Sequence, residues 1–265
     1  MLMQTDITIF DDMATGELGE MKIVHPPATF SPTPASRIAL RAIGLNQALL
    51  RVNGLDWGCG TGCLAIAAAK IGGVKQVIGL DISLPNVAVA RQNGLLNGVA
   101  DKVTFFVADS YTPVAEEDRQ QLAAWRGQVN FILSNPPASD GDDGFGYRRV
   151  VLAGARDYLV RGGVVFLNIS CQYGWPRIEA LTQQFPQFRH EGLLASSDWV
   201  PFDLQRPDLL ACLADYAHEE ASGGLPYWFM TPAGTAQTAQ TALAHFHQNG
   251  ASPLTQWQTH LFRFV

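Results

Sequence analysis

The chain has 265 residues, of which 47% are hydrophobic and 16% are charged, enough apolar material for one large domain or a domain with an appendage. Its formal net charge of −6 provides no general attraction to nucleic-acid phosphates, and no local basic patch is visible in the sequence. No apolar run reaches the roughly 18 residues of a membrane span, and the N-terminus lacks the pattern of a secretory signal. We therefore predict a cytoplasmic protein without a membrane partner.

The four cysteines lack the paired spacing of a metal site, because two of them are four residues apart with no second pair and the other two are isolated. We predict no metal site and interpret all four as buried free thiols. They are Cys59, Cys63, Cys171 and Cys212.

Residues 1–50 have irregular and helical character, and after them short β-rich runs alternate with helical segments. This alternation is typical of a parallel sheet covered by helices on both faces, so we predict an α/β fold with a doubly wound, mainly parallel sheet. The strands expected in this part are Val52–Trp57, Gln76–Asp81, Val103–Ala108, Val129–Ser134 and Val164–Ile169. The helices expected are Gly62–Ile71, Pro85–Asn97, Tyr147–Val160 and Pro176–Gln184.

The regular alternation ends near Phe188. A sixth strand is expected at Gly192–Ser196 and a seventh at Thr259–Val265, with a helix at Thr235–Gln248 in the proline- and glycine-containing region between them. We expect an N-terminal segment at 1–50, a core at 51–200, an insertion at 201–258 and the last core strand at 259–265. An insertion of this length is either a functional cap over a substrate site or a structural excursion, and the sequence favours neither.

Three glycines at alternate positions follow the first expected strand. Gly58, Gly60 and Gly62 stand between this strand and a helix of small residues, with Asp56 before them and Cys59 among them. Glycine permits a tight turn and lets a ligand approach the backbone N–H groups and the N-terminus of the helix. In this context the loop indicates a binding site for a polar ligand.

Acids follow the next two strands. Asp81 stands nineteen residues beyond Gly62, where in this architecture a carboxylate can accept hydrogen bonds from both ribose hydroxyls. Asp109 ends the third run, where it or a neighbouring backbone group can meet an adenine amino group. Ile82 and Ser110, which directly follow these acids, complete the candidate cofactor contacts. The pattern indicates a cofactor that contains adenosine.

Together, the loop Asp56-x-Gly58-x-Gly60-x-Gly62 and the two strand-end acids resemble the cofactor motifs of class I S-adenosylmethionine-dependent methyltransferases, over roughly residues 30–170. The resemblance implies a Rossmann-like, seven-stranded methyltransferase sheet and S-adenosylmethionine as cofactor. It also implies that the glycine loop surrounds the amino-acid part of the cofactor and that the first acid binds the ribose. A nicotinamide dehydrogenase is disfavoured, because its Gly-x-Gly-x-x-Gly loop places the third glycine one residue later.

The sharpest signal is Asn135-Pro136-Pro137, directly after the fourth expected strand, at the edge of the sheet where such folds hold reactants. Two successive prolines stiffen the loop. The Asn135 side-chain oxygen and the Pro136 carbonyl can then accept the two hydrogens of a substrate –NH2, leaving its lone pair directed at a methyl donor. Since such catalysis depends on orientation, we predict an N-methyltransferase with this catalytic motif, in which Asn135 also contacts the cofactor.

Asn135-Pro136-Pro137 resembles the signature of methyltransferases that act on planar amino groups, in nucleobases or in a glutamine side chain of peptide release factors. Further residues resemble the release-factor glutamine methyltransferase group, namely Asp140–Gly144, Tyr147-Arg148-Arg149, Tyr158-Leu159, Gly162-Gly163 and Gln172. Upstream, Phe30–Ser36 resembles the proline-containing segment that precedes the cofactor loop in that group and can close over the methyl donor.

The sequence departs from this group in two ways. Ala138 stands where the group usually has an aromatic ring against the flat substrate group, and the first fifty residues are shorter than the expected helical substrate-recognition domain. The acceptor therefore stays open among a protein side chain, a nucleobase and a small amine. Ordinary packing is favoured for each ring that could replace the missing one: Phe145, Tyr147, Tyr173 and Trp175.

Two other hypotheses stay open. One is a methyltransferase for a different small-molecule nucleophile, in which Ala138 marks a lost specificity for planar groups. The other is a catalytically silent cofactor-binding protein, against which Asn135 and the complete glycine loop argue.

Overall fold

The computed structural model describes residues 6–139 and 142–265. Its central sheet has the strand order β6-β5-β4-β3-β7-β8-β14-β9. These strands are β3 (Val52–Trp57), β4 (Val74–Asp81), β5 (Val103–Asp109), β6 (Thr112–Pro113), β7 (Val129–Ser134), β8 (Leu159–Asn168), β9 (Phe188–Ser196) and β14 (Gln258–Phe264). The predicted α/β fold with a mainly parallel sheet is confirmed, and the two-residue β6 adds a short edge strand to the seven expected.

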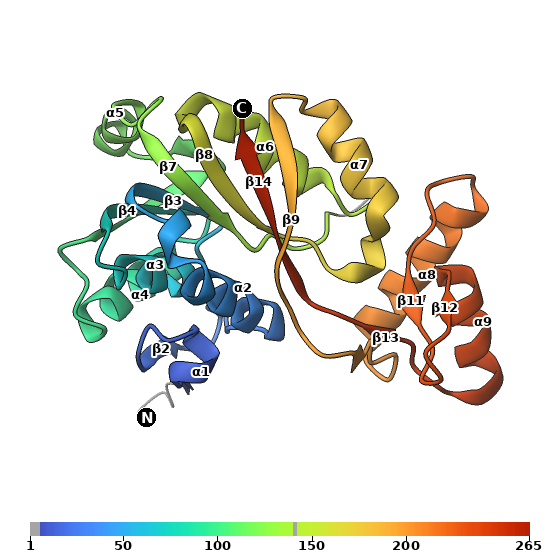
Figure 1. Ribbon diagram of the computed structural model, residues 1–265. Coiled ribbons are helices and arrows are strands. Elements are labelled where there is room, and N and C mark those ends of the chain that lie inside the picture. Colours follow the sequence, from blue (N-terminus) through green and yellow to red (C-terminus); the bar gives the residue numbers. More distant parts are fainter. Residues whose placement is uncertain (1–5, 140–141) are drawn as a thin grey trace.

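Helices cover both faces of the sheet (Figure 1). One face packs against α2 (Pro34–Leu45), α3 (Cys63–Ala69) and α4 (Leu84–Leu96). The other face packs against α5 (Glu116–Ala123), α6 (Gly146–Tyr158) and α7 (Gly174–Gln184). Alternate residues of β7 join the two apolar clusters, because successive side chains of a strand point to opposite faces. The sheet is therefore buried on both sides, as expected for parallel strands.

Several element boundaries differ from the sequence prediction, and β9 begins at Phe188 instead of Gly192. The helix expected to reach Val160 ends at Tyr158, and β8 begins at Leu159 instead of Val164. Helix α5 was not predicted, because its sequence is strongly polar and only Leu122 is buried. These differences lie away from the end of β8 that faces the cavity described below.

The N-terminal segment contains a hairpin that the sequence analysis did not predict. It consists of β1 (Asp6–Phe10), the short helix α1 (Asp12–Thr15) and β2 (Met21–His25), and the 3-10 turn η1 (Gln47–Leu49) follows α2. Asn93 of α4 and Asn97, which directly follows that helix, hold β2 in place, because their side-chain oxygens accept hydrogen bonds from the backbone N–H groups of Val24 and Lys22. The hairpin thereby closes one side of the helix layer.

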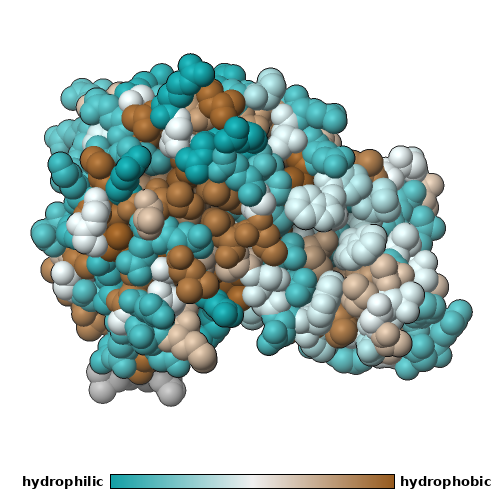
Figure 2. Space-filling model, viewed as in Figure 1, coloured by the Kyte–Doolittle hydropathy of each residue, from teal (hydrophilic) through white to brown (hydrophobic). Residues whose placement is uncertain are grey.

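The chain leaves the main sheet after β9 and returns to it at β14. The intervening segment, residues 200–257, is called the cap segment below. It contains β10 (Val200–Pro201), α8 (Pro207–Ala221), β11 (Phe229–Met230), β12 (Ala236–Gln237), α9 (Ala239–Asn249) and β13 (Leu254–Thr255). Its short strands form a separate sheet in the order β10-β13-β11-β12, and it stands beside the main sheet as a second lobe (Figures 1 and 2).

Helix α9 begins four residues later than predicted, because Thr238 caps it by accepting a hydrogen bond from the backbone of Thr241. Residues ahead of it form β12 instead.

Figure 2 shows apolar residues gathered on the larger lobe, whereas the cap segment presents mostly pale and polar residues in this view. Within the described ranges, no helix has both the length and the apolar character needed to cross a membrane.

Candidate active site

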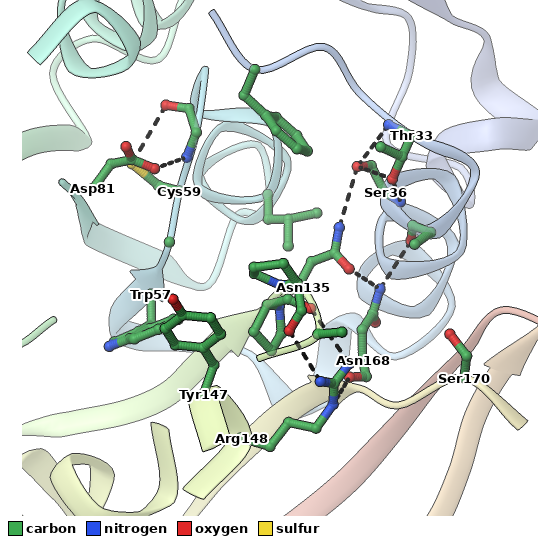
Figure 3. A pocket seen from close by; sticks show the side chains of 18 of the residues that line it. Thr33, Ser36, Trp57, Cys59, Asp81, Asn135, Tyr147, Arg148, Asn168 and Ser170 are labelled. Carbon is green, nitrogen blue, oxygen red and sulfur yellow. Dashed lines mark hydrogen bonds between the residues drawn. The ribbon is translucent and has the colours of Figure 1, made fainter. Parts of the chain in front are cut away.

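A cavity of about 860 Å³ opens at the carboxyl ends of the parallel strands. Strand β3 lies between β4 and β7, so the chain order reverses on either side of it. Ligands bind at such switch points in open α/β sheets. The glycine loop after β3 and the Asn135-Pro136-Pro137 loop after β7 both line this cavity (Figure 3).

The three glycines of the loop adopt backbone conformations with positive φ. Gly58, Gly60 and Gly62 have φ angles of 70°, 53° and 88°, a region that side chains with a Cβ rarely adopt. A Cβ added to Gly58 would meet no atom within 4 Å, whereas one on Gly60 would lie 2.7 Å from the ring of Phe30. Gly58, Cys59 and Gly60 line the cavity, and Gly62 lies behind them.

Asp81 ties the loop to the second strand. Its Oδ2 accepts a hydrogen bond of 2.7 Å from the backbone N–H of Gly60, and its Oδ1 accepts from the backbone N–H of Ser83 and from Asn86 Nδ2. Each carboxylate oxygen can accept more than one hydrogen bond, so Asp81 can still serve a ligand in the cavity that it lines. The structure thus gives this acid a second task, which is to hold the glycine loop.

The other predicted cofactor contacts surround Asp81. Ile82 lines the cavity and is 73% exposed, which suits an apolar platform for a bound ring. Asp109 is exposed at the end of β5. Ser110 adopts a positive φ of 55°, and its Oγ accepts a hydrogen bond of 2.9 Å from the indole N–H of Trp57. These residues form one wall of the cavity.

Asp56 does not line the cavity, unlike the other acids predicted there. Its side chain is fully buried behind the glycine loop, where Oδ2 accepts a hydrogen bond from the backbone N–H of Ala65. Oδ1 has no partner in the described structure. Burial raises the pKa of Asp56 to about 7, the Ala65 hydrogen bond opposes that rise, and the charge of Asp81 adds to it.

The residues present fit S-adenosylmethionine. A Cβ on Gly58 would project into empty space of the cavity, so the glycine leaves this space to a ligand. The carboxylates at the ends of β4 and β5 line the same cavity. The Phe30 ring lies against Gly60 of the loop. Its backbone is held there, because the N–H donates to Asn86 Oδ1 and the carbonyl accepts from the hydroxyl of Thr61. The cofactor roles of these residues stay predictions.

Asn135 lies at the centre of a side-chain network. Its Oδ1 accepts a hydrogen bond of 2.8 Å from Asn168 Nδ2, and its Nδ2 donates to Ser36 Oγ at 3.4 Å (Figure 3). Asn168 also donates to the backbone oxygen of Ala35. These contacts set the orientation of the Asn135 amide, and its oxygen retains a second acceptor position.

Arg148 holds the two prolines. Its guanidinium donates to the carbonyl oxygens of Pro136 at 3.4 Å, Pro137 at 3.1 Å and Gly144 at 2.9 Å, and its Nε donates to that of Asn168. The Arg148 side chain is itself buried against aromatic rings. The loop is therefore fixed by hydrogen bonds as well as by proline.

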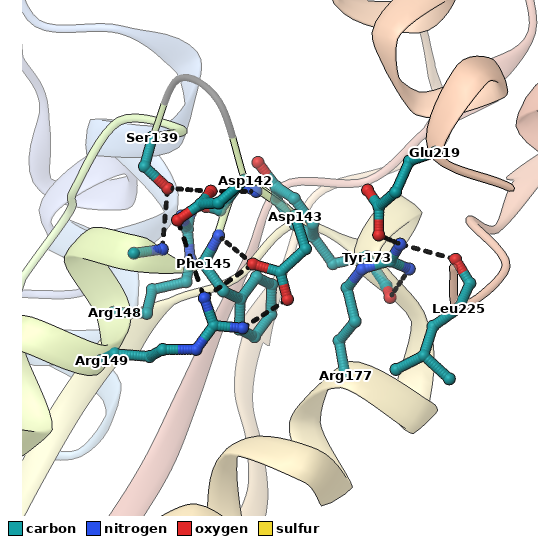
Figure 4. Close-up of polar contacts among 12 residues, drawn as sticks. Ser139, Asp142, Asp143, Phe145, Arg148, Arg149, Tyr173, Arg177, Glu219 and Leu225 are labelled. Atoms are coloured by element: carbon teal, nitrogen blue, oxygen red, sulfur yellow. Dashed lines mark hydrogen bonds and ion pairs between the residues drawn. The ribbon is translucent and has the colours of Figure 1, made fainter. Parts of the chain in front are cut away.

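The segment after the prolines is tied down by side chains (Figure 4). Asp142 accepts hydrogen bonds from the backbone of Gly144 and from the hydroxyl of Ser139, and Asp143 forms an ion pair with Arg149. Arg149 and the backbone N–H of Phe145 lower the pKa of Asp143, against the effect of its partial burial. Asp140, part of the resemblance noted above, lies outside the described residues.

The candidate replacement rings divide into two groups. Tyr147 and Tyr173 line the cavity, and the Tyr147 ring lies 6.1 Å from that of Trp57. Phe145 is buried in the core, and Trp175 packs against two histidine rings outside the cavity. Only Tyr147 and Tyr173 of these four rings thus line the cavity beside Ala138.

Several lining residues escaped the sequence analysis. Asn168 ends β8 and Ser170 follows it, whereas Phe202, Leu209 and Tyr216 come from the cap segment. A position at a strand end or on one face of a helix indicates a cavity-lining residue only when the strand order is known. The cap contribution could not be predicted, because the sequence does not show where the segment folds back.

Among the described residues no cysteine forms a disulfide, but Cys171 and Cys212 are only partly buried, so the prediction of burial is wrong for these two. Within the described residues, no group of three or more His, Cys, Asp or Glu side chains could hold a metal ion.

Strand order and cavity position together define a Rossmann-like α/β protein of the methyltransferase type. The methyltransferase small domain family matches residues 20–192. The chain therefore belongs to the methyltransferase small domain family, and the class I S-adenosylmethionine-dependent methyltransferase resemblance is confirmed.

Two proteins with sequences similar to this chain are also methyltransferases. The chain is 26% identical over 154 residues to a release factor glutamine methyltransferase of Thermodesulfovibrio yellowstonii, over 52% of this chain and 55% of the relative. It is 48% identical over 82 residues to a ribosomal protein L11 methyltransferase of Dechloromonas aromatica, over 31% of this chain and 24% of the relative. The matches thus span about half of the first relative's length and less of the second.

Solved structures share the fold at low sequence identity. The tRNA m1G37 methyltransferase of M. jannaschii superposes with a TM-score of 0.52 at 13% identity, covering 97% of this chain and 56% of that one. The YcgJ protein of Bacillus subtilis superposes with a TM-score of 0.51 at 13% identity, covering 84% and 98%. At this identity the likeness concerns the fold alone.

Proposed function

We propose that this chain binds S-adenosylmethionine along the glycine loop and transfers its methyl group to an amide or amino nitrogen. The observation that carries the proposal is that Asn135 and Pro136 line the same cavity as Gly58 and Asp81. When bound, S-adenosylmethionine supplies a methyl group on a sulfonium leaving group that departs with the S–C electron pair, while the acceptor nitrogen forms the new bond and releases a proton to water. The chain's own task is to orient the acceptor.

Two oxygens perform that task. The second acceptor position of Asn135 Oδ1 and the carbonyl of Pro136 receive the two N–H groups of the acceptor. Asn168 and Arg148 donate to these same oxygens and fix their positions before the acceptor arrives. A prearranged pair of acceptors lowers the entropic cost of reaching the reactive geometry.

We also propose that the cap segment is a substrate cap. Leu209, Cys212 and Tyr216 stand at spacings of three and four along α8 and all line the cavity. One face of this helix therefore forms the wall opposite the glycine loop, which favours a functional cap over a structural excursion.

The first test is isothermal titration with S-adenosylhomocysteine and, in parallel, with NAD. We expect binding of the former alone, and binding of NAD alone would refute the cofactor assignment. The second test measures S-adenosylhomocysteine formation over a panel of glutamine peptides, nucleosides and small amines. Asn135→Ala should retain S-adenosylhomocysteine affinity and lose transfer, whereas unchanged turnover on the true acceptor would refute the catalytic role.

A further inference from the structure

Outside the glycine loop the cavity lining has a chemistry of its own. The walls there are mainly apolar and aromatic side chains, contributed by the cap segment and by α6. They are Tyr147, Val150, Phe202, Leu209, Tyr216 and Trp257. This region is called the acceptor compartment below. A flat apolar body fits such walls better than a strongly hydrated one.

Two side chains that line this compartment each carry a polar atom that makes no hydrogen bond within the described residues. Gln172 is 4% exposed and lines the cavity, and its Oε1 accepts a hydrogen bond of 2.6 Å from the hydroxyl of Thr255. Among the described residues, neither Gln172 Nε2 nor Ser170 Oγ makes a hydrogen bond. Because Thr255 occupies the amide oxygen, Gln172 offers N–H donors to the cavity. The Gln172 amide nitrogen is thus an unpaired donor at the cavity wall, where an acceptor oxygen on a ligand can meet it.

The same compartment contains a buried cation. Arg148 is 4% exposed and contacts only carbonyl oxygens and the faces of aromatic rings. It takes part in none of the ion pairs formed within residues 6–139 and 142–265. A charge buried without a counterion favours an anion in the space beside it. Figure 3 shows Arg148 and Asn168 together at the base of the cavity, with Ser170 beyond them.

The wall formed by α8 is held in a fixed position. Arg177 of α7 is fully buried, pairs with Glu219 of α8 at 2.9 Å and donates to the backbone oxygens of Leu225 and Pro226 (Figure 4). Tyr216 donates from its hydroxyl to that of Tyr173. A compartment with this many fixed walls is preorganised for a small molecule.

We infer that the methyl acceptor is a small aromatic amine or amide that carries a carboxylate. The inference rests on the proposed function, because it places the reacting nitrogen at Asn135 and Pro136. The aromatic body lies against Tyr147 and the cap residues, and the carboxylate accepts hydrogen bonds from Gln172 Nε2 and Ser170 Oγ in the field of Arg148. Neither the cofactor motifs nor the named relatives assign a ligand to this compartment.

The test uses the full chain saturated with S-adenosylhomocysteine and three probes, 2-, 3- and 4-aminobenzoate, whose binding is followed by ligand-observed NMR. Aniline and the matching aminobenzamide are the comparison compounds, since they lack the carboxylate or its charge. We expect one aminobenzoate to bind about tenfold or more tightly than either, as befits hydrogen bonds to a charged group. Failure of all three isomers to bind the loaded protein would overturn the inference.

Two single substitutions test where the carboxylate of the acceptor binds. Gln172→Leu and Ser170→Ala should each weaken binding of the best isomer by about tenfold, in line with a charge-assisted hydrogen bond. The matched control is Gln183→Leu, which changes an exposed residue of α7. If both compartment variants bind the isomer as tightly as the wild type, the assignment is wrong.

The two proposals fail differently. Lack of S-adenosylhomocysteine binding by the wild type would refute the proposed function, whereas a normal cofactor titration without aminobenzoate binding would refute only the acceptor class. S-adenosylhomocysteine affinity also reports whether each variant is folded. A glutamine-containing tripeptide that displaces the best aminobenzoate, and is itself methylated, would instead identify a peptide acceptor.

Discussion

The side-chain amide of Asn168 donates a hydrogen bond of 2.8 Å to Oδ1 of Asn135, and so joins the end of β8 to the end of β7. Asn168 Oδ1 in turn accepts a hydrogen bond of 2.5 Å from the hydroxyl of Thr259 in β14. The same side chain reaches the backbone oxygen of Ala35 at the start of α2. One amide thereby links three strands and a helix around the proposed catalytic oxygen.

Asn168→Asp should impair transfer more than cofactor binding, because a carboxylate would face Asn135 Oδ1 where an N–H now donates. We expect the turnover number to fall by about 100-fold, the scale expected when a reacting group is displaced by about 1 Å. The measurement is the rate of S-adenosylhomocysteine formation together with its dissociation constant. Asn130→Asp, at the opposite end of β7, is the control. Equal losses of turnover in the two variants would argue against a positioning role for Asn168.

Asp81→Ala should weaken S-adenosylhomocysteine binding more than Asp109→Ala does. Asp81 offers charge-assisted hydrogen bonds to a ribose and also anchors the N–H of Gly60, whereas Asp109 is exposed at the cavity rim. We expect about 100-fold for the former, as for the loss of two hydrogen bonds to a charged group, and about threefold for the latter, as for one weak contact. Calorimetry that gave the wild type and Asp81→Ala the same affinity would remove the ribose assignment.

The pH dependence of stability should reveal Asp56. Its pKa of about 7 in the folded chain exceeds the value of about 3.9 for an unfolded chain, so the folded state binds the proton more tightly. The stabilisation is therefore complete below pH ~3.9 and is lost as pH rises through 7. Relative to Asp56→Asn, the wild type should lose up to about 4 kcal/mol of unfolding free energy between pH 4 and 8.

Urea unfolding of both proteins across this range measures the effect. The comparison must be a difference between the two, because burial lowers the pKa of His260 to about 3. A neutral buried histidine makes stability rise with pH from about 3 to about 6.5, opposite to the effect of Asp56. Identical pH profiles for the wild type and Asp56→Asn would show that Asp56 does not titrate in this range.

Arg177→Met should loosen the cap segment, because it leaves Glu219 without its cation and removes a guanidinium that lies 3.6 Å from the centre of the Tyr227 ring. Breaking a buried ion pair on one side costs about 3–5 kcal/mol. Hydrogen exchange should accelerate in α8 and leave the glycine loop unchanged. Arg161→Met, at an exposed position of β8, is the matched control. Equal protection of α8 in both variants would mean that Arg177 does not anchor the cap segment.

The core of the fold was predictable because its signals are local. A β-rich run followed by Gly58, Gly60 and Gly62 marks a strand, a turn and a helix within a few residues, and the same holds for Asn135 after β7. The hairpin at the N-terminus and α8 were missed, because prolines, glycines and acids in their neighbourhoods masked short apolar patterns.

The network around Asn135 could not be predicted, because its partners are distant in the sequence. Asn168 is 33 residues away from Asn135, and Ala35 is 133 residues away from Asn168. Nothing in either segment marks a hydrogen-bonding partner until the strand order brings them together. Arg148 is similar, since a charged residue in a helix is normally read as exposed and only the structure shows it buried.

Ser196 of β9 and Gln258 of β14 are paired neighbours across two antiparallel strands, so the cap segment departs and returns at one point of the sheet. Everything between them is, topologically, an enlarged hairpin turn. The pairing of two core strands fixes its ends, and residues such as Phe202 and Leu213 pack it against the main hydrophobic core. A change within this segment can therefore reach the cavity wall at Leu209 and Tyr216 while β3, β4 and β7 keep their pairing beneath the glycine loop.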